Sequence, residues 1–275
     1  MDLGEIKLLN NHKVFLDRFV AACERDERVA AAFLVGSYAK GKADTYSDID
    51  LCVITADDSF ENFMADGEKF FRQLGELVFL EDFDIPKIFF YIFSDDTEGE
   101  LNVGRESEIN QVFNAPYKVL LDKKNVMEGL STTASEPTDS QAKQIEKMRR
   151  EIYWFWHDLS HFMTAMRRGQ LWWARGQLDV LRPMCINLAR FQHNFLDSDA
   201  GEDAYSKVEQ ALPIEQLSPL QETFCPMEKG AMLQAVRVIV DFYKRLAPAL
   251  AQKHGITYPV GLEKVMMARL NTLTG

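Results

Sequence analysis

The sequence has few cysteines and no long apolar run. Its four cysteines stand far apart and form no Cys-x-x-Cys pair: Cys23, Cys52, Cys185 and Cys225. This spacing argues against a disulfide framework or a zinc site and fits reduced thiols. No stretch approaches the roughly 20 apolar residues of a membrane span, and residues 1–5 lack the features of a signal peptide. We therefore expect a cytoplasmic protein that is not anchored in a membrane.

Basic residues are also in deficit, since the formal net charge is −11 at pH 7. Proteins that bind long nucleic acids usually carry a basic face, because phosphate neutralisation supplies much of their affinity. The charge therefore argues against a long nucleic-acid partner and favours a cationic small molecule. A length of 275 residues with 47% hydrophobic residues allows one large domain or two ordinary ones, with a sizeable core.

The two halves of the chain differ in pattern, which predicts two domains, 1–130 and 141–275. Between them, residues 131–140 are small and polar with one proline, a composition typical of a linker. We expect the first domain to be α+β with a small mixed sheet, and the second to be an α-helical bundle.

Apolar spacing locates the elements of the first domain. It predicts a helix over residues 6–23 and a buried strand from Val29 to Val35. It also predicts a strand from Asp48 to Thr55 and a helix from Ser59 to about Leu74. The remaining expected elements are a hairpin of strands 87–94 and 100–103 around the turn 95–99, and a strand over 117–121.

The second domain is expected to consist of helices alone. A stripe from Ile145 to Met166 predicts a first helix of about six turns. A second helix is expected from Leu171 to about Phe195, interrupted near Pro183. Further helices are expected over 204–212, 228–253 and 260–272.

The most informative segment runs from Leu34 to Leu51. Gly36 and Ser37 follow the first strand, where glycine allows close approach of the backbone to a phosphate. Asp48 and Asp50 are two apart on the next expected strand, which places both carboxylates on one face with Cα atoms roughly 6–7 Å apart. Such a pair can bind Mg²⁺, which prefers oxygen ligands.

Two lysines, Lys40 and Lys42, lie between these parts, where an ammonium can meet the phosphates of a nucleotide. An Asp-x-Asp pair alone is often only a solvated strand edge, and Gly-Ser alone is often only a turn. Their combination at this spacing favours a nucleotide and metal site.

This segment resembles the signature of the DNA polymerase β-like nucleotidyltransferase superfamily. Within that superfamily the chain is similar to the antibiotic nucleotidyltransferases, and most to their lincosamide branch. The similarity extends to residues 99–103, 167–170 and 256–259. It is strong over residues 28–52 and loose elsewhere.

The resemblance implies a third carboxylate on a neighbouring strand, and Glu100 is the expected residue. It would act as a metal ligand or as the general base. The superfamily pattern has apolar residues on both sides of this acid, whereas here Asn102 holds the position between Leu101 and Val103. Asn102, Asp82 and Asp84 are therefore alternatives.

The resemblance also implies the reaction. We expect transfer of AMP from ATP to a hydroxyl of a lincosamide or aminoglycoside, with two Mg²⁺ ions bound by Asp48, Asp50 and Glu100. Gly36, Ser37, Lys40, Lys42 and Ser47 would bind the nucleotide. The helical domain is expected to serve acceptor binding and dimerisation, so a homodimer is expected. Transfer to a protein or tRNA target, or a regulator that has lost catalysis, are the alternatives.

Two further features occur in the expected bundle. His157 and His161 are four residues apart on one helix and could bind zinc. The glutamate of the His-Glu-x-x-His motif is absent, since Asp158 follows His157, and this favours a surface or cleft role. Trp154 and Trp173 fall outside the apolar stripes, so one of them could line an acceptor cleft or a subunit contact.

Overall fold

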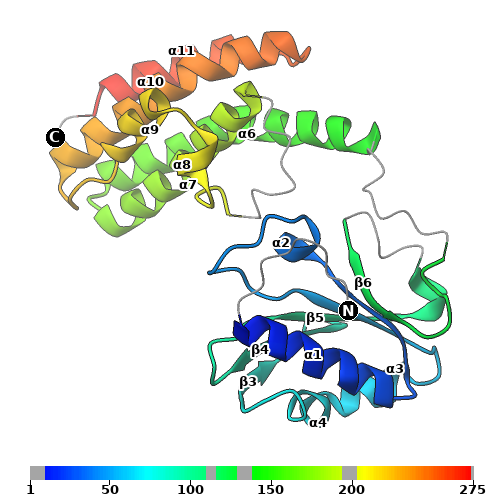
Figure 1. The fold of residues 1–275 in the computed structure, drawn as a ribbon. Helices are drawn as coiled ribbons and strands as arrows, with labels where there is room; N and C mark the ends of the chain where they lie inside the picture. The colour runs from blue at the N-terminus through cyan, green and yellow to red at the C-terminus, as the bar shows by residue number, and fades with distance from the viewer. Residues whose placement is uncertain (1–9, 110–115, 129–137, 194–202, 274–275) are drawn as a thin grey trace. The chain divides into compact units, whose positions relative to one another are not determined.

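The computed structural model describes residues 10–109, 116–128, 138–193 and 203–273. The chain divides into two compact units, Met1–Glu136 and Pro137–Gly275, each of which is shown in Figure 1. Residues 131–137 of the expected linker lie outside the described residues. From Thr138 onward the chain is already helical.

The first unit is built on a mixed six-stranded sheet with the strand order β3-β4-β5-β2-β1-β6. The α+β fold class with a small mixed sheet is confirmed. The strands, in chain order, are β1 (Val29–Leu34), β2 (Leu51–Thr55), β3 (Leu77–Glu81), β4 (Ile88–Phe93), β5 (Glu98–Arg105) and β6 (Lys118–Asp122). Strands β2 and β5 pair in parallel, with Leu51 beside Leu101 and Cys52 beside Asn102.

The two faces of this sheet are covered differently. Helices α1 (Asn10–Arg25), α3 (Phe60–Ala65) and α4 (Gly67–Phe71) lie against one face, as Figure 1 shows. Their aromatic side chains pack on alternate strand residues such as Leu51 and Leu101 in the main core of the unit. A smaller cluster around Phe33, Cys52 and Tyr117 covers part of the opposite face.

Several expected elements of this unit differ in extent. The predicted helix from Ser59 to Leu74 is broken at Asp66 into α3 and α4. The break fits tight packing at Gly67, where an added Cβ would lie 2.5 Å from the Phe89 ring. The expected hairpin is present, but its second strand already begins at Glu98. Strand β3 was not predicted from the sequence.

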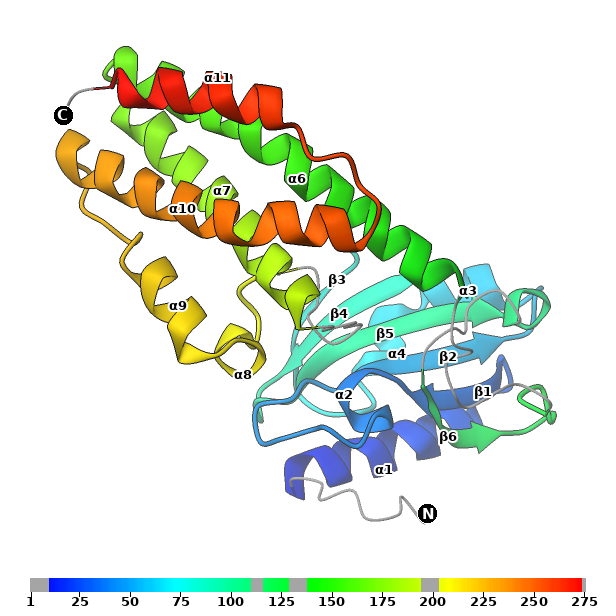
Figure 2. The same cartoon turned by 90° about the horizontal axis from the view of Figure 1, so that it is seen from above.

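The second unit consists of helices around one apolar core, so the predicted helical bundle is confirmed (Figure 2). Its described helices are α6 (Thr138–Arg167), α7 (Leu171–Gln192), α8 (Val208–Ala211), α9 (Ile214–Gln221), α10 (Lys229–Lys253) and α11 (Val260–Asn271). Among the residues described, no helix is long and apolar enough to cross a membrane.

Helix α7 differs from expectation because it runs through Pro183 without interruption. Proline removes one backbone hydrogen bond and usually breaks a helix. Here Leu178, Leu181, Cys185 and Ile186 on both sides of it are buried in the core, so packing keeps the helix continuous. The predicted end of this helix at Phe195 lies outside the described residues. Helix α9 was not predicted.

Candidate active site

The site begins where β1 ends. Val35 leads into a four-residue helix, α2 (Gly36–Ala39). Gly36 has φ +61°, a left-handed conformation that favours glycine. A Cβ on Gly36 would lie 2.0 Å from Oδ2 of Asp50. The turn can therefore approach the carboxylate only because residue 36 has no side chain.

Asp48 and Asp50 stand just before β2 and not within it, because the strand begins at Leu51. The segment is still extended, and backbone hydrogen bonds join it to the chain on both sides. The Ile49 N–H donates to the Glu98 carbonyl at 2.8 Å, and the Val35 N–H donates to the Asp50 carbonyl at 3.0 Å. Ile49 is fully buried. The alternation predicted for a strand therefore holds, with Asp48 and Asp50 directed away from the core that contains Ile49.

Tyr91 of β4 supports the same segment from the core side. Its buried hydroxyl donates a hydrogen bond to the Ile49 carbonyl at 2.5 Å. Burial, together with the charges of Asp50, Asp48 and Glu100, raises the pKa of Tyr91. The hydroxyl therefore stays protonated and remains a donor. No sequence signal pointed to Tyr91.

The parallel pairing of β2 and β5 brings the third carboxylate beside the first two. The Leu51–Leu101 and Cys52–Asn102 pairs set the register, and one step back along it Asp50 stands beside Glu100. Neighbouring residues in register point to the same face of a sheet. Asp48, Asp50 and Glu100 therefore occupy the face opposite the α1, α3 and α4 layer.

The electrostatics reflect this proximity. Burial, followed by the charges of Asp48 and Glu100, raises the pKa of Asp50 to about 7, while Lys40 acts in the opposite direction. Burial and the charge of Asp48 raise the pKa of Glu100 as well. Ionised carboxylates held this close destabilise one another unless a cation lies between them. The arrangement therefore fits a divalent cation with oxygen ligands.

The residues expected to bind nucleotide are distributed around this cluster. Ser37 lies in α2, and its hydroxyl is buried without a hydrogen-bond partner among the described residues. Lys40 ends α2, and its charge acts on Asp50. The Ser47 hydroxyl accepts a hydrogen bond from the Asp44 N–H at 2.8 Å, which holds the loop before Asp48. Lys42 is exposed in the same loop.

The alternatives to Glu100 lie in different surroundings. Asp82 and Asp84 are exposed in the turn after β3, and β3 is the edge strand on the far side of β4 and β5. Asn102 stands beside Cys52, one step further into the sheet. The carboxylates whose charges act on Asp50 are Asp48 and Glu100, which favours Glu100 among these alternatives.

A cavity of about 210 Å³ opens on this side of the sheet. Asp48, Glu98, Gly99 and Glu100 line it, together with Phe79, Phe90, Tyr91 and Ile92. Glu98 was not considered from the sequence, where it was assigned to the turn. Its place two residues before Glu100 on the same strand could have revealed it, because strand side chains alternate between faces.

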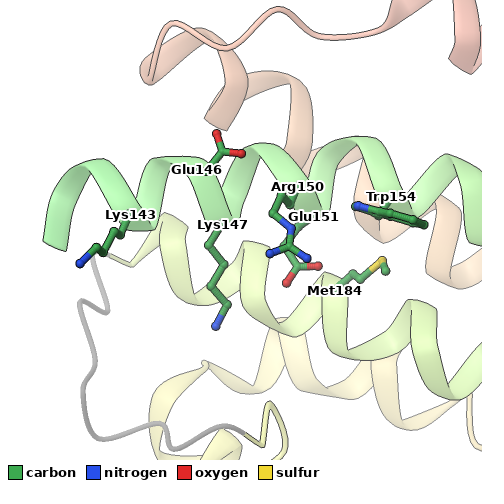
Figure 3. A pocket seen from close by; sticks show the side chains of 7 residues that line it. All are labelled: Lys143, Glu146, Lys147, Arg150, Glu151, Trp154 and Met184. Carbon is green, nitrogen blue, oxygen red and sulfur yellow. The ribbon is translucent and has the colours of Figure 1, made fainter. Parts of the chain in front are cut away.

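The helical unit contains a larger cavity of about 560 Å³ between α6 and α7, drawn in Figure 3. The side chains that line it are Lys143, Glu146, Lys147, Arg150, Glu151, Trp154 and Met184. Glu151 accepts a hydrogen bond from Asn187 at 2.8 Å. Burial raises its pKa, while Asn187, Lys147 and Arg150 act in the opposite direction. The cavity thus offers a half-buried carboxylate next to an exposed indole.

A family model described as streptomycin adenylyltransferase matches residues 9–273. The chain belongs to this family. It is therefore a nucleotidyltransferase enzyme, as the sequence predicted, and its relatives are antibiotic nucleotidyltransferases. The narrower resemblance to the lincosamide branch stays a prediction.

Two solved structures are similar over most of the chain. An aminoglycoside 6-adenyltransferase from Bacillus subtilis is 15% identical, with 97% of this chain and 100% of that chain covered and a TM-score of 0.45. A STING-associated CdnE c-di-GMP synthase from Capnocytophaga granulosa is 13% identical, with 87% and 82% covered and a TM-score of 0.32. Both similarities are low, and the family assignment depends on the family model alone. No curated protein sequence matches the chain.

Proposed function

We propose that this enzyme transfers AMP from ATP to a hydroxyl group of an aminoglycoside, in a reaction that depends on Mg²⁺. One observation carries the proposal: Asp48, Asp50 and Glu100 share one sheet face, where burial and then the charges of Asp48 and Glu100 raise the pKa of Asp50. Membership of the streptomycin adenylyltransferase family supports the nucleotide and the acceptor class.

The carboxylate cluster fits a magnesium site in its chemistry. Its ligand atoms are carboxylate oxygens, and its mutual repulsion is the kind that a bound divalent cation relieves. Bound Mg²⁺, expected as two ions, would neutralise the triphosphate and orient it. Asp48, Asp50 and Glu100 would hold the ions.

The chain's own residues supply the other steps. Where Glu100 does not itself hold an ion, it is suited to accept the proton of the acceptor hydroxyl, because burial and the charge of Asp48 raise its pKa. That hydroxyl attacks the α-phosphorus, the bond from this phosphorus to the bridging oxygen breaks, and pyrophosphate leaves. The buried and unpartnered Ser37 hydroxyl can donate to a phosphate oxygen. Lys40 and Lys42 provide positive charge for the leaving group, and Ser47 positions the loop.

We assign acceptor binding to the cavity between α6 and α7. Aminoglycosides carry several ammonium groups, which a half-buried carboxylate such as Glu151 can bind, and sugar rings, which can pack on an indole such as Trp154. The net charge of −11 favours the approach of such a cation. This assignment gives the helical unit the acceptor role and the first unit the catalytic role. A cytoplasmic location and a homodimer stay predictions.

Labelled nucleotides test the proposal directly. The full chain is incubated with α-labelled ATP, GTP, CTP or UTP, with Mg²⁺, and with a panel of aminoglycosides and lincosamides. We expect label on an aminoglycoside from ATP only, abolished by EDTA and by Asp48→Asn/Asp50→Asn. Label on a lincosamide would show that the acceptor is a lincosamide, and the proposed nucleotidyl transfer would still hold. If no drug is labelled but pyrophosphate is released, the acceptor lies outside the antibiotics.

A further inference from the structure

We propose that helix α6 carries a second metal site, one for a transition-metal ion such as Zn²⁺, formed by His157, Asp158 and His161. One ligand atom from each of these three side chains lies within 4.8 Å of the others. The site belongs to the helical unit and is built from nitrogen and oxygen atoms. It therefore differs in composition from the carboxylate cluster of the sheet.

The helix explains the grouping. Residues four apart face the same side of a helix, and the ring centroids of His157 and His161 are 4.4 Å apart. Asp158 would normally project about a quarter of a turn away from His157. Its Oδ1 nevertheless lies 2.9 Å from Nδ1 of His157. The residue that argued against zinc in the sequence therefore supplies the third ligand.

The distances suit one small ion. Two atoms that are each about 2.0–2.1 Å from a tetrahedral Zn²⁺ lie about 3.4 Å apart. The 2.9 Å pair of His157 and Asp158 can therefore share an ion after a small opening. The wider spread to His161 would have to close by small rotations of the imidazoles, and the 49% exposure of the His157 side chain leaves room for them.

Aromatic side chains flank the ligands on both sides. The Trp154 ring lies 4.7 Å from the ring of His157 in an edge-on arrangement. On the other side, the Trp173 ring of α7 lies 5.8 Å from that of His161. These contacts limit the orientations of both imidazoles. Solvent reaches His157, so an ion can enter the site. A tetrahedral ion held by three side chains would have its fourth coordination position open to water.

The ligand set determines which ions can bind. Two imidazoles and one carboxylate suit Zn²⁺, Ni²⁺ and Cu²⁺, whereas Mg²⁺ prefers a shell of oxygen atoms. An excess of Mg²⁺ should therefore leave Zn²⁺ on α6. Excess Mg²⁺ therefore distinguishes the site on α6 from the site proposed for catalysis. The inference does not depend on which acceptor the enzyme uses.

Calorimetric titration with Zn²⁺ in the presence of excess Mg²⁺ tests the inference. The full chain with Asp48→Asn/Asp50→Asn is used, so that the sheet carboxylates contribute no transition-metal site. We expect one Zn²⁺ per chain and a rise in Tm, since an ion that binds only the folded state stabilises it. Ni²⁺ or Cu²⁺ should also quench tryptophan fluorescence, because Trp154 and Trp173 adjoin the site.

Variants in this background identify the ligands. His157→Ala and His161→Ala should each weaken Zn²⁺ binding by more than the roughly 10–100-fold typical of losing an outer-shell partner. Asp158→Asn should weaken it as well. His193→Ala removes an exposed imidazole just after the end of α7 and should change nothing. Equal affinity in His161→Ala and the parent, or no Zn²⁺ bound by the parent, would overturn the proposal.

Discussion

The backbone at Gly36 approaches the carboxylate of Asp50 so closely that a Cβ on residue 36 would stand 2.0 Å from Oδ2. This contact joins the turn after β1 to the segment before β2. It connects the two parts of the sequence motif, which are 14 residues apart, in one rigid arrangement. The glycine therefore determines where Asp50 can lie, in addition to allowing the turn itself.

Gly36→Ala should consequently lower kcat/KM by about 10²-fold or more, because a shift of about 1 Å in a catalytic group has effects of this size. The positive φ adds roughly 1–2 kcal/mol of strain to the folded state. Steady-state kinetics and thermal unfolding measure the two effects. Gly255→Ala is the matched control, because Gly255 has φ +68° with nothing within 4 Å of its Cβ position. If both variants lose activity equally, strain and not the contact with Asp50 is responsible.

Much of this site could be predicted from the sequence because it depends on local pattern. Buried Ile49 between Asp48 and Asp50 identifies which face the carboxylates take, whether or not the segment is formally part of β2. Gly36 after an apolar strand likewise predicts a tight turn. These inferences need only the period of an extended chain and the conformational freedom of glycine.

The position of Glu100 needed information that local pattern does not contain. It stands beside Asp50 because β5 pairs in parallel with β2 in one register, and these strands are about 50 residues apart in the chain. A shift of one residue would have turned Glu100 into the core and Leu101 toward Asp48 and Asp50. The resemblance to a family suggested Glu100, and the strand pairing explains it.

The errors in the fold also have local causes. The sequence does not predict strand β3, because its apolar residues do not alternate with polar ones as they do in a half-buried strand. Val78 and Phe79 are neighbours, both apolar and both exposed. Pro183 predicted a break that the buried neighbours of α7 prevent. Tertiary packing outweighed the local signal at Pro183, whereas β3 lacked a local signal altogether.

Removing the Asp50 carboxylate should stabilise the metal-free protein above neutral pH. The folded protein binds a proton at Asp50 up to about pH 7, whereas the unfolded chain releases it near pH 4. The free energy of unfolding therefore falls as pH rises through this window. At about 1.4 kcal/mol per pKa unit, Asp50→Asn should gain at most about 4 kcal/mol at pH 8, lowered by solvent screening. At pH 4 it should gain almost nothing.

Denaturant unfolding in EDTA at both pH values measures this gain. Asp82→Asn, at an exposed turn position, serves as the control and should show no pH-dependent gain. A stability of Asp50→Asn equal to that of the parent at pH 8 would contradict the raised pKa of Asp50, which burial and then the charges of Asp48 and Glu100 cause.

Magnesium should act on the same repulsion. At pH 8, Mg²⁺ should raise the Tm of the parent chain, because a cation bound between the carboxylates stabilises their ionised forms. The same Mg²⁺ should leave the Tm of Asp48→Asn/Asp50→Asn unchanged. Differential scanning calorimetry with and without Mg²⁺ compares them. An equal rise in both proteins would mean that Mg²⁺ acts elsewhere.

Two glutamates of β5, Glu98 and Glu100, allow a test of which residue is the third carboxylate. Glu100→Gln should lower kcat by about 10²-fold or more, the range expected for loss of a general base, and remove the base-dependent limb of the pH–rate profile. Glu98 lies on the same strand face and lines the same cavity as Glu100. Glu98→Gln should lower kcat by less than about tenfold. A larger loss for Glu98→Gln or Asp82→Asn than for Glu100→Gln would reassign the role.

If the cavity between α6 and α7 binds the acceptor, as we propose, changes in its lining should alter KM for the drug and not KM for ATP. Glu151→Gln removes the half-buried negative charge and keeps the hydrogen bond from Asn187 possible, so KM for an aminoglycoside should rise by about tenfold or more. Trp154→Ala should have a similar effect through lost packing on the sugar rings. KM for ATP should stay constant in both variants, because the nucleotide is assigned to the first unit. Trp172→Ala provides the matched control, since Trp172 is an exposed indole of α7 that lines a different cavity. If KM for ATP rises with that for the drug, the cavity serves the nucleotide, and the acceptor binds elsewhere in the enzyme.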